Sequence, residues 1–441
     1  MLQEPDTHRP LRVGLVGYAF MGAIHSQAWR TADRFFDLPR RPELVAITGR
    51  NQQAASHAGA RMGWQEVEPD WQHLIERDDI DLVDICSPGD THAEIAIAAL
   101  EAGKHVLCEK PLANSVAEAE QMAKAADAAA QRGVFAMCGY SYRRTPALAL
   151  ARRLVQEGRL GTIRQVRAQY LQDWLSEDTA PLTWRLDKTK SGSGALGDIG
   201  AHIIDAAQWI TGQKITGVSA LMETFVRERP LGGELVGLGG RGDASSTGPV
   251  TVDDAAIFSA RFEQGPIGVF EATRAALGRR NAMRIEVNGS SGSLSFDFED
   301  MNFLQFYSAQ DSDGTAGFHR IMVTEPEHPY MKHWWPTGHG LGYEHLFTHE
   351  VADLVTAIGA GTQPSPSFGE ALQVRSTHST LSSRVPARTA SGQLHRAAPV
   401  SRLRPPDRDR RAADDRNTSP GPHRPRRLGR PPTRRDDQPL R

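Results

Sequence analysis

Cysteine is scarce in this 441-residue sequence, which holds only Cys86, Cys108 and Cys138. An odd number in a chain too long to need disulfide staples argues against a disulfide framework. All three lie within or at the end of apolar, strand-like runs, and this placement favours buried, reduced thiols over a redox or metal role. We therefore expect a cytoplasmic protein.

Long apolar runs are also missing. The first ten residues contain no apolar segment of the signal-peptide kind, and nowhere do about 18 apolar residues follow one another without interruption. The sequence thus predicts no membrane partner. With 39% hydrophobic and 24% charged residues the composition is that of a globular protein, and the length allows two cores.

The formal net charge is only −2, but the two signs are unevenly distributed. Residues 375–441 contain 17 Arg and 6 Asp and no Lys or Glu, so this segment carries +11 and the rest of the chain −13. An acidic main body argues against nucleic acid as a partner.

The basic segment, residues 375–441, also lacks Ile, Met, Cys, Phe, Tyr and Trp, while Arg and Pro abound. Such a composition cannot build a core, so we expect a disordered tail. Arg, Pro, Ala and Gly are favoured by GC-rich codons, which suggests a reading frame translated out of register. A selected basic arm is the alternative, although such arms usually mix Lys with Arg.

What the sequence does contain, from Leu11 to about Tyr140, is a strict alternation of short apolar runs with Ala-rich stretches of helical period. This alternation predicts a parallel sheet covered by helices on both faces, with ligands bound beyond the carboxyl ends of its strands. We assign residues 1–145 to a Rossmann dinucleotide-binding domain.

Residues 146–374 show a different pattern, in which alternating runs are separated by Gly/Ser turns and interrupted by one helix at about Asp198–Ile210. This pattern predicts an α+β substrate and oligomerisation domain with an open, mostly antiparallel sheet. The expected fold class is therefore α/β, with the Rossmann domain first.

The first apolar run ends in Gly17-x-Ala19-x-x-Gly22 and opens a helix, which is the context that a dinucleotide fingerprint requires. The second run ends in Arg50 rather than in an acidic residue that would bind a ribose 2′-hydroxyl. Arg50 suits a 2′-phosphate or stacking on adenine, and a solvated arginine is the alternative. NAD and NADP both remain open.

Two further motifs place polar groups together. In the motif EKPLA, Lys110 precedes a proline at the end of an apolar run. In the motif GDIGAHIID, Asp198 and His202 are four residues apart, and Asp205 lies on the same helical stripe. A carboxylate beside an imidazole can orient it and raise its pKa into the range of general acid–base catalysis. A surface Asp–His pair is the alternative.

In this order, the three motifs resemble the Gfo/Idh/MocA family of oxidoreductases over about Leu11–Val374, and among its members the levoglucosan-type and inositol-type sugar dehydrogenases. The resemblance implies hydride transfer between NAD or NADP and a secondary hydroxyl of a sugar, cyclitol or related polyol. It also implies a homo-oligomer, either a dimer or a tetramer. Lys110, Asp198 and His202 would be the catalytic residues. Ser141 stands where the family usually has Asn.

On this resemblance, cofactor and substrate contacts can be assigned to residues. The expected cofactor-binding residues are Gly17, Ala19, Phe20, Met21, Gly22, Arg50, Ser87, Pro88, His92, Glu109 and Lys110. The expected substrate-binding residues are Lys110, Tyr142, Trp184, Arg185, Asp198, His202, Trp335 and His339.

The segment from His328 to Glu350 holds several histidines, and His345 and His349 have helical spacing. The segment lacks the glutamate of an H-E-x-x-H site, so we predict no metal. Trp334, Trp335, His339 and Tyr343 either line a sugar-stacking pocket or pack beneath the sheet.

Two rival functions remain open. Some members of the family resemble glycosidases that use bound NAD for a transient oxidation, and others have lost catalysis and act as sensors. A sensor would be expected to lack one of the three catalytic residues, all of which are present here.

Overall fold

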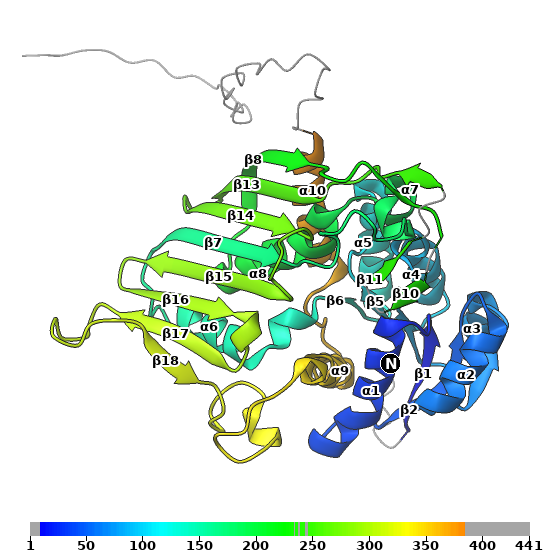
Figure 1. The fold of residues 1–441 in the computed structure, drawn as a ribbon. Helices are drawn as coiled ribbons and strands as arrows, with labels where there is room; N and C mark the ends of the chain where they lie inside the picture. The colour runs from blue at the N-terminus through cyan, green and yellow to red at the C-terminus, as the bar shows by residue number, and fades with distance from the viewer. Residues whose placement is uncertain (1–8, 233, 237–238, 243–245, 384–441) are drawn as a thin grey trace, which may run out of the picture. The chain divides into compact units, whose positions relative to one another are not determined.

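The computed structural model describes residues 9–232, 234–236, 239–242 and 246–383. Its N-terminal part is built on a six-stranded, entirely parallel sheet in the order β3-β2-β1-β4-β5-β6 (Figure 1). The strands are β1 Leu11–Val16, β2 Pro42–Thr48, β3 Glu66–Glu68, β4 Leu82–Ile85, β5 His105–Glu109 and β6 Ala136–Gly139.

Helices connect these strands, as the alternating pattern predicts. They are α1 Phe20–Phe35, α2 Gln52–Met62, α3 Trp71–Glu76, η1 Gly89–Thr91, α4 His92–Glu101 and α5 Val116–Ala130. The order of the strands reverses between β1 and β4, and ligands of doubly wound sheets bind beyond the carboxyl ends at such a reversal. The Rossmann prediction is confirmed.

The second sheet has eight strands in the order β18-β17-β16-β15-β7-β14-β13-β8. Only the pair β7–β14 is parallel among these neighbours. The strands are β7 Ile163–Leu171, β8 Ile215–Glu223, β13 Ala255–Phe262, β14 Ile267–Thr273, β15 Ala282–Gly289, β16 Gly292–Asp297, β17 Phe303–Ser308 and β18 His319–Met322. The predicted open, mostly antiparallel sheet is therefore confirmed.

One face of this sheet is covered by α6 Pro146–Gln156, α8 Ala201–Thr211 and α10 Phe368–Ser383, whereas no helix of the described residues covers the other face (Figure 1). The alternation of buried and exposed residues along β13 reflects these two environments. The remaining long helix is α9 Tyr343–Gly359. The short helical turns are η2 Ser141–Arg144, η3 Trp184–Leu186, α7 Lys188–Ser191, η4 Leu196–Gly200, η5 Phe298–Asp300 and η6 Met331–His333. Two small ladders pair β9 Glu228–Pro230 with β12 Thr247–Pro249 and β10 Glu234–Val236 with β11 Gly239–Arg241.

Helix α10 continues about two turns beyond the predicted boundary at Val374, as far as Ser383. Leu381 and His378, which follow that boundary, are buried, as are Val374 and Phe368 before it. The buried part of α10 therefore extends beyond residue 375 and includes one histidine, His378. The rest of the tail, residues 384–441, lies outside the described residues.

The three cysteines are free thiols, and Cys108 and Cys138 are buried. Cys86 is only partly buried, whereas all three thiols were expected to be buried. Among the described helices, none combines the length and the apolar character needed to cross a bilayer.

Candidate active site

The turn between β1 and α1 has the shape of a phosphate-binding loop. Gly17 has a φ of 106°, and a Cβ added there would lie 2.7 Å from the Cys86 carbonyl oxygen. A Cβ on Gly22 would lie 2.0 Å from the Gly17 carbonyl oxygen, so both positions require glycine. Ala19 is the N-cap of α1 and makes no side-chain cap, which leaves the first N–H groups of the helix available to a pyrophosphate.

Beyond the second strand, Arg50 is exposed, and no ion pair or side-chain hydrogen bond is recorded for it with any described residue. Gly49 lies against the ring of Tyr18, where a Cβ would approach Cε1 to 2.4 Å. The nearby Asn51 caps α2 through its side chain. A free guanidinium at this edge is available to the adenosine part of a dinucleotide.

His92 has a different role from the one predicted. It is 1% exposed, with Nδ1 3.0 Å from the Pro111 carbonyl oxygen and Nε2 2.8 Å from the Ser87 carbonyl oxygen. These contacts leave no ring nitrogen for a cofactor. His92 therefore ties together the loops that follow β4 and β5, and the cofactor contacts expected of Ser87 and Pro88 fall on one of these loops.

Lys110 follows β5 directly and reaches across to the second half of the chain. Its Nζ donates to the Asp198 carbonyl oxygen at 2.8 Å and to Asp198 Oδ1 at 3.3 Å. Asp198 Oδ2 lies 3.5 Å from Nη1 of Arg274, whose side chain is 1% exposed. One carboxylate thus joins two cations that come from different sheets.

The electrostatics of Asp198 follow from these neighbours. Burial alone would raise the pKa of Asp198, but the charges of Lys110, Arg274 and Arg185 outweigh it and hold the pKa well below its usual value. Asp198 is therefore a carboxylate at neutral pH. It holds the ammonium group of Lys110 at the point where an active site would need a cation.

The predicted pairing of Asp198 with His202 is not found. Asp198 lies in the π-helical turn η4, and no hydrogen bond between the two side chains is recorded in the described part of the chain. His202 instead stacks on Tyr142, with ring centroids 4.4 Å apart. Its Nδ1 is buried without a hydrogen-bond partner among the described residues.

The expected increase in the pKa of His202 is also wrong. Burial lowers the pKa of His202 well below its usual value, Lys110 lowers it further, and Asp198 offsets only part of this. The imidazole is therefore neutral at physiological pH and can accept a proton. Asp205, on the same helix, forms an ion pair with Arg143 instead, at 2.5 Å.

Hydroxyl and amide groups form a wall beside His202; of its members, Tyr142 was predicted to bind substrate, whereas Tyr170 and Asn281 were not identified from the sequence. The Tyr142 and Tyr170 hydroxyls are 2.6 Å apart, and the Tyr170 hydroxyl donates to Asn281 Oδ1 at 2.7 Å. Tyr170 and Asn281 lie on or beside strands that read as ordinary sheet, so only their inward position in the alternation could have indicated them. Arg274 was missed for the same reason, since an arginine after a strand resembles a solvated one.

Trp184 and Arg185 are linked to Asp198 through the charge of Arg185. The Arg185 guanidinium stacks over the Trp184 ring at 4.5 Å. Burial lowers the pKa of Arg185, the charge of Asp198 raises it, and the charge of Arg274 lowers it. The charged groups of Arg185, Asp198 and Arg274 therefore lie in one region. The contact of Arg185 with substrate stays a prediction.

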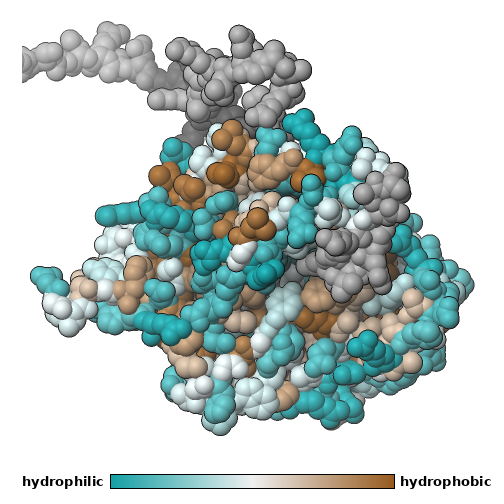
Figure 2. Space-filling view, in the orientation of Figure 1, coloured by the Kyte–Doolittle hydropathy of each residue, from teal (hydrophilic) through white to brown (hydrophobic). Residues whose placement is uncertain are grey.

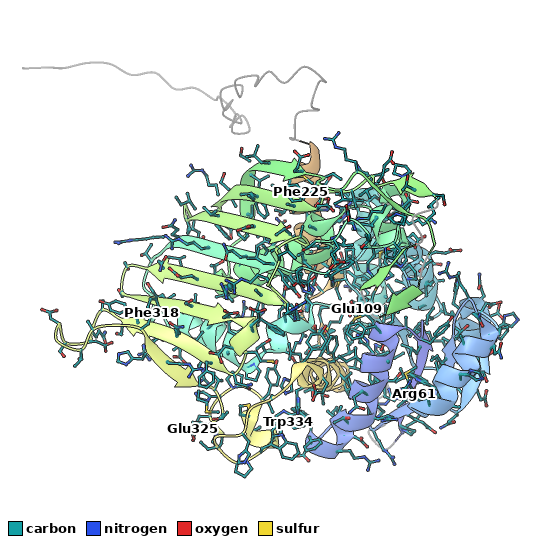
Figure 3. All side chains as sticks on the ribbon, in the orientation of Figure 1. Arg61, Glu109, Phe225, Phe318, Glu325 and Trp334 are labelled. Atoms are coloured by element: carbon teal, nitrogen blue, oxygen red, sulfur yellow. The ribbon has the colours of Figure 1, made fainter. Side chains whose placement is uncertain are left out.

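Trp335 and His339 are placed elsewhere. The Trp335 ring contacts Phe35, the last residue of α1, at 5.4 Å, whereas the phosphate-binding turn precedes the first residue of that helix. A helix of 16 residues is about 24 Å long. His339 is exposed, with Nδ1 2.8 Å from the Pro336 carbonyl oxygen. Figure 3 shows the neighbouring Trp334 in the loop beside the end of α1, well away from Glu109. The predicted substrate contacts of Trp335 and His339 are therefore not supported within one chain.

The histidine-rich segment has a structural role. His349 is fully buried, accepts a hydrogen bond from Trp334 Nε1 at 2.7 Å and donates through Nδ1 to the Arg144 carbonyl oxygen at 2.9 Å. Both of its ring nitrogens are therefore used. His345 Nδ1 accepts from the Gly342 N–H at 3.1 Å, so this pair is not arranged to bind a metal.

Comparison with known proteins gives a consistent result. The NAD-binding Rossmann domain of the Gfo/Idh/MocA oxidoreductases matches residues 11–140, and the C-terminal domain of these proteins matches residues 148–295. Levoglucosan dehydrogenase of Pseudarthrobacter phenanthrenivorans is 42% identical over 369 residues, which cover 82% of this chain and 93% of that protein.

Solved structures show the same relation. A levoglucosan dehydrogenase in complex with NADH and levoglucosan is 39% identical, with a TM-score of 0.80, and covers 85% of this chain and 97% of its own. An oxidoreductase domain protein from Kribbella flavida is 61% identical, with a TM-score of 0.81 and the same coverage of the two chains.

Proposed function

Because the chain belongs to the Gfo/Idh/MocA family and is an NAD-binding oxidoreductase of sugar or polyol hydroxyls, we propose that Lys110, Asp198 and His202 catalyse its reaction. An anhydrosugar such as levoglucosan is the first candidate substrate. The observation that carries the proposal is that Asp198 holds the Lys110 ammonium group in the same region as His202, whose ring feels the charges of both residues and whose Nδ1 has no hydrogen-bond partner among the described residues.

Each residue has a distinct task in the oxidation. Bound NAD supplies the hydride acceptor. His202 accepts the hydroxyl proton at a ring nitrogen, which its neutral state allows. Lys110 donates a hydrogen bond to the substrate oxygen and stabilises the negative charge that develops there. Asp198 holds the Lys110 side chain in place, and the ring of Tyr142 covers one face of His202.

A screen of sugars, anhydrosugars and cyclitols with NAD and with NADP tests this proposal. The expected result is cofactor reduction, read as absorbance of the reduced nicotinamide, with at least one secondary alcohol. Release of an aglycone from a glycoside without net NADH would favour the glycosidase. Sugar binding without either reaction would favour the sensor.

Arg50 provides a test of cofactor choice. If its guanidinium contacts a 2′-phosphate, Arg50→Ala should weaken NADP binding about tenfold or more while leaving NAD binding nearly unchanged. Fluorescence titration of both cofactors measures this, with the exposed Arg61→Ala on α2 as a control. An equal effect on both cofactors would show that Arg50 stacks on adenine or makes no contact.

We also propose a homo-oligomer that covers the helix-free face of the second sheet. Leu221, Ile257, Ile267 and Val269 on its strands are between 49% and 75% exposed, and Figure 2 shows apolar side chains gathered over these strands. A second copy would bury this surface. Val269→Asp should lower the mass measured by light scattering, whereas Ser56→Asp, which adds the same charge at an exposed position on α2, should leave the mass unchanged. A monomeric wild-type protein would contradict the proposal.

A further inference from the structure

A buried imidazole links helix α1 to the start of the Lys110 turn. His25 is 1% exposed, and its Nδ1 lies 3.0 and 2.9 Å from the two carboxylate oxygens of Asp84, on β4. Its Nε2 lies 3.1 Å from Oε1 of Glu109, the last residue of β5. Each ring nitrogen thus faces a carboxylate, and all three side chains are buried.

We infer that His25 is a positioning residue that, as a buried cation between two carboxylates, fixes Glu109 and through it the backbone of Lys110. The inference rests on the proposed catalytic role of Lys110. Glu109 Oε2 accepts the Lys110 backbone N–H at 3.2 Å, while Oε1 faces His25. The side chain of Glu109 therefore connects His25, on α1, to the backbone of Lys110.

The charge state follows from donors and acceptors. Ionised carboxylates only accept hydrogen bonds, so an imidazole between two of them must donate from both nitrogens. Asp84 also accepts from Trp29 Nε1 at 2.7 Å and from the Cys86 thiol at 3.6 Å, so both of its oxygens act as acceptors. Burial alone would lower the pKa of His25, but the charge and hydrogen bonds of Asp84 raise it well above its usual value.

Other elements also bring titratable groups to this cluster. Glu350 on α9 is 1% exposed, and burial raises its pKa to about 8, so it is largely uncharged at neutral pH. Arg144 Nη1 is 3.7 Å from Glu350 Oε1. Gly139 on β6 provides space, because a Cβ there would lie 2.7 Å from Glu109 Oε1. The groups in direct contact at the start of the Lys110 turn are therefore one imidazole, that of His25, and the two carboxyl groups of Asp84 and Glu109.

A metal site is the competing interpretation, since His25, Asp84 and Cys86 could offer ligand atoms within 4.8 Å of one another. Burial raises the pKa of the Cys86 thiol far above its usual value, so it stays protonated, and His25 Nδ1 already contacts Asp84. A protonated thiol and an occupied nitrogen are poor ligands. The cluster is better explained as a hydrogen-bonded ion network.

The test is a mutant cycle on the active enzyme. His25→Gln removes the cation and leaves Glu109 buried without its partner, so kcat should fall about tenfold or more while KM for NAD changes less than about threefold. Adding Glu109→Gln removes the unpaired charge, and the new amide oxygen can still accept the Lys110 N–H. The double variant should therefore recover to within about threefold of wild-type kcat.

Two results would overturn the inference. One is His25→Gln with kcat within about twofold of wild type, and the other is a folded double variant with no recovery, which would indicate a packing role alone. Circular dichroism gives the folded fraction to which kcat is normalised.

A measurement independent of turnover separates this inference from the proposed function. In NMR spectra of histidine-labelled wild-type protein, the resonances that disappear in His25→Gln belong to His25. At pH 7 they should report protons on both ring nitrogens. A neutral ring at pH 7 would refute the buried cation even in an active enzyme. Conversely, wild-type protein that oxidises no polyol would refute the proposed function and leave this readout intact.

Discussion

Lys110→Met is expected to lower kcat by about a hundredfold or more while the Kd for NADH stays within about threefold of wild type. Methionine keeps much of the length of the lysine side chain but has no charge and no donor. The variant therefore lacks the hydrogen bond that would stabilise an alkoxide. The dinucleotide turn should be unaffected, because Gly17 and Gly22 make no contact that requires Lys110.

Stopped-flow or steady-state absorbance of NADH measures the loss, and fluorescence titration gives the Kd for NADH. Lys124→Met is a suitable control, because Lys124 is exposed on α5 and should tolerate the change. Lys110→Arg keeps the positive charge but changes its position, so it should recover part of the activity at most. Turnover near the wild-type rate in Lys110→Met would remove Lys110 from the mechanism.

The parts of the fold that the sequence predicted well depend on local rules. Strict alternation of apolar runs and helices leaves few alternatives to a doubly wound sheet. The glycines at positions 17 and 22 are required by backbone contacts that any such turn makes. Lys110 was predicted because a parallel strand ends where ligands bind, and this is a property of the fold rather than of one side chain.

The predictions that were wrong depend on contacts between distant segments. Asp198 and His202 are four residues apart, and an α-helix would align them, but the π-helical turn η4 winds more widely and changes that alignment. Asp198 instead pairs with Lys110, 88 residues earlier, and with Arg274, 76 residues later. Composition and spacing do not encode such pairs.

The aromatic segment after β18 shows a second limit. Trp335 was predicted to line the sugar site because indole rings often stack on sugars, but it packs on Phe35 at the far end of α1. Helix α9 lies beside α1 and places this loop there. The sequence showed which rings gather but not which element they pack against.

His202→Ala is expected to reduce kcat by about a hundredfold or more at pH 7, because the group that accepts the hydroxyl proton is lost. The expected pH dependence follows from its environment. A base acts when deprotonated, and burial and Lys110 hold the pKa of His202 well below its usual value. The wild-type kcat should therefore stay level from neutral pH down through pH 6.5 and fall only at lower pH.

In His202→Ala, water or hydroxide must take the proton, so the residual rate should rise with pH over the range in which the wild-type rate is level. His57→Ala, a change of an exposed histidine on α2, should reproduce the wild-type profile. Initial rates of NADH formation from pH 5 to pH 9 provide the comparison. If the variant keeps a level profile at reduced rate, His202 only shapes the pocket, and the base must be sought elsewhere, with the Tyr142–Tyr170 hydroxyl pair as the nearest candidate.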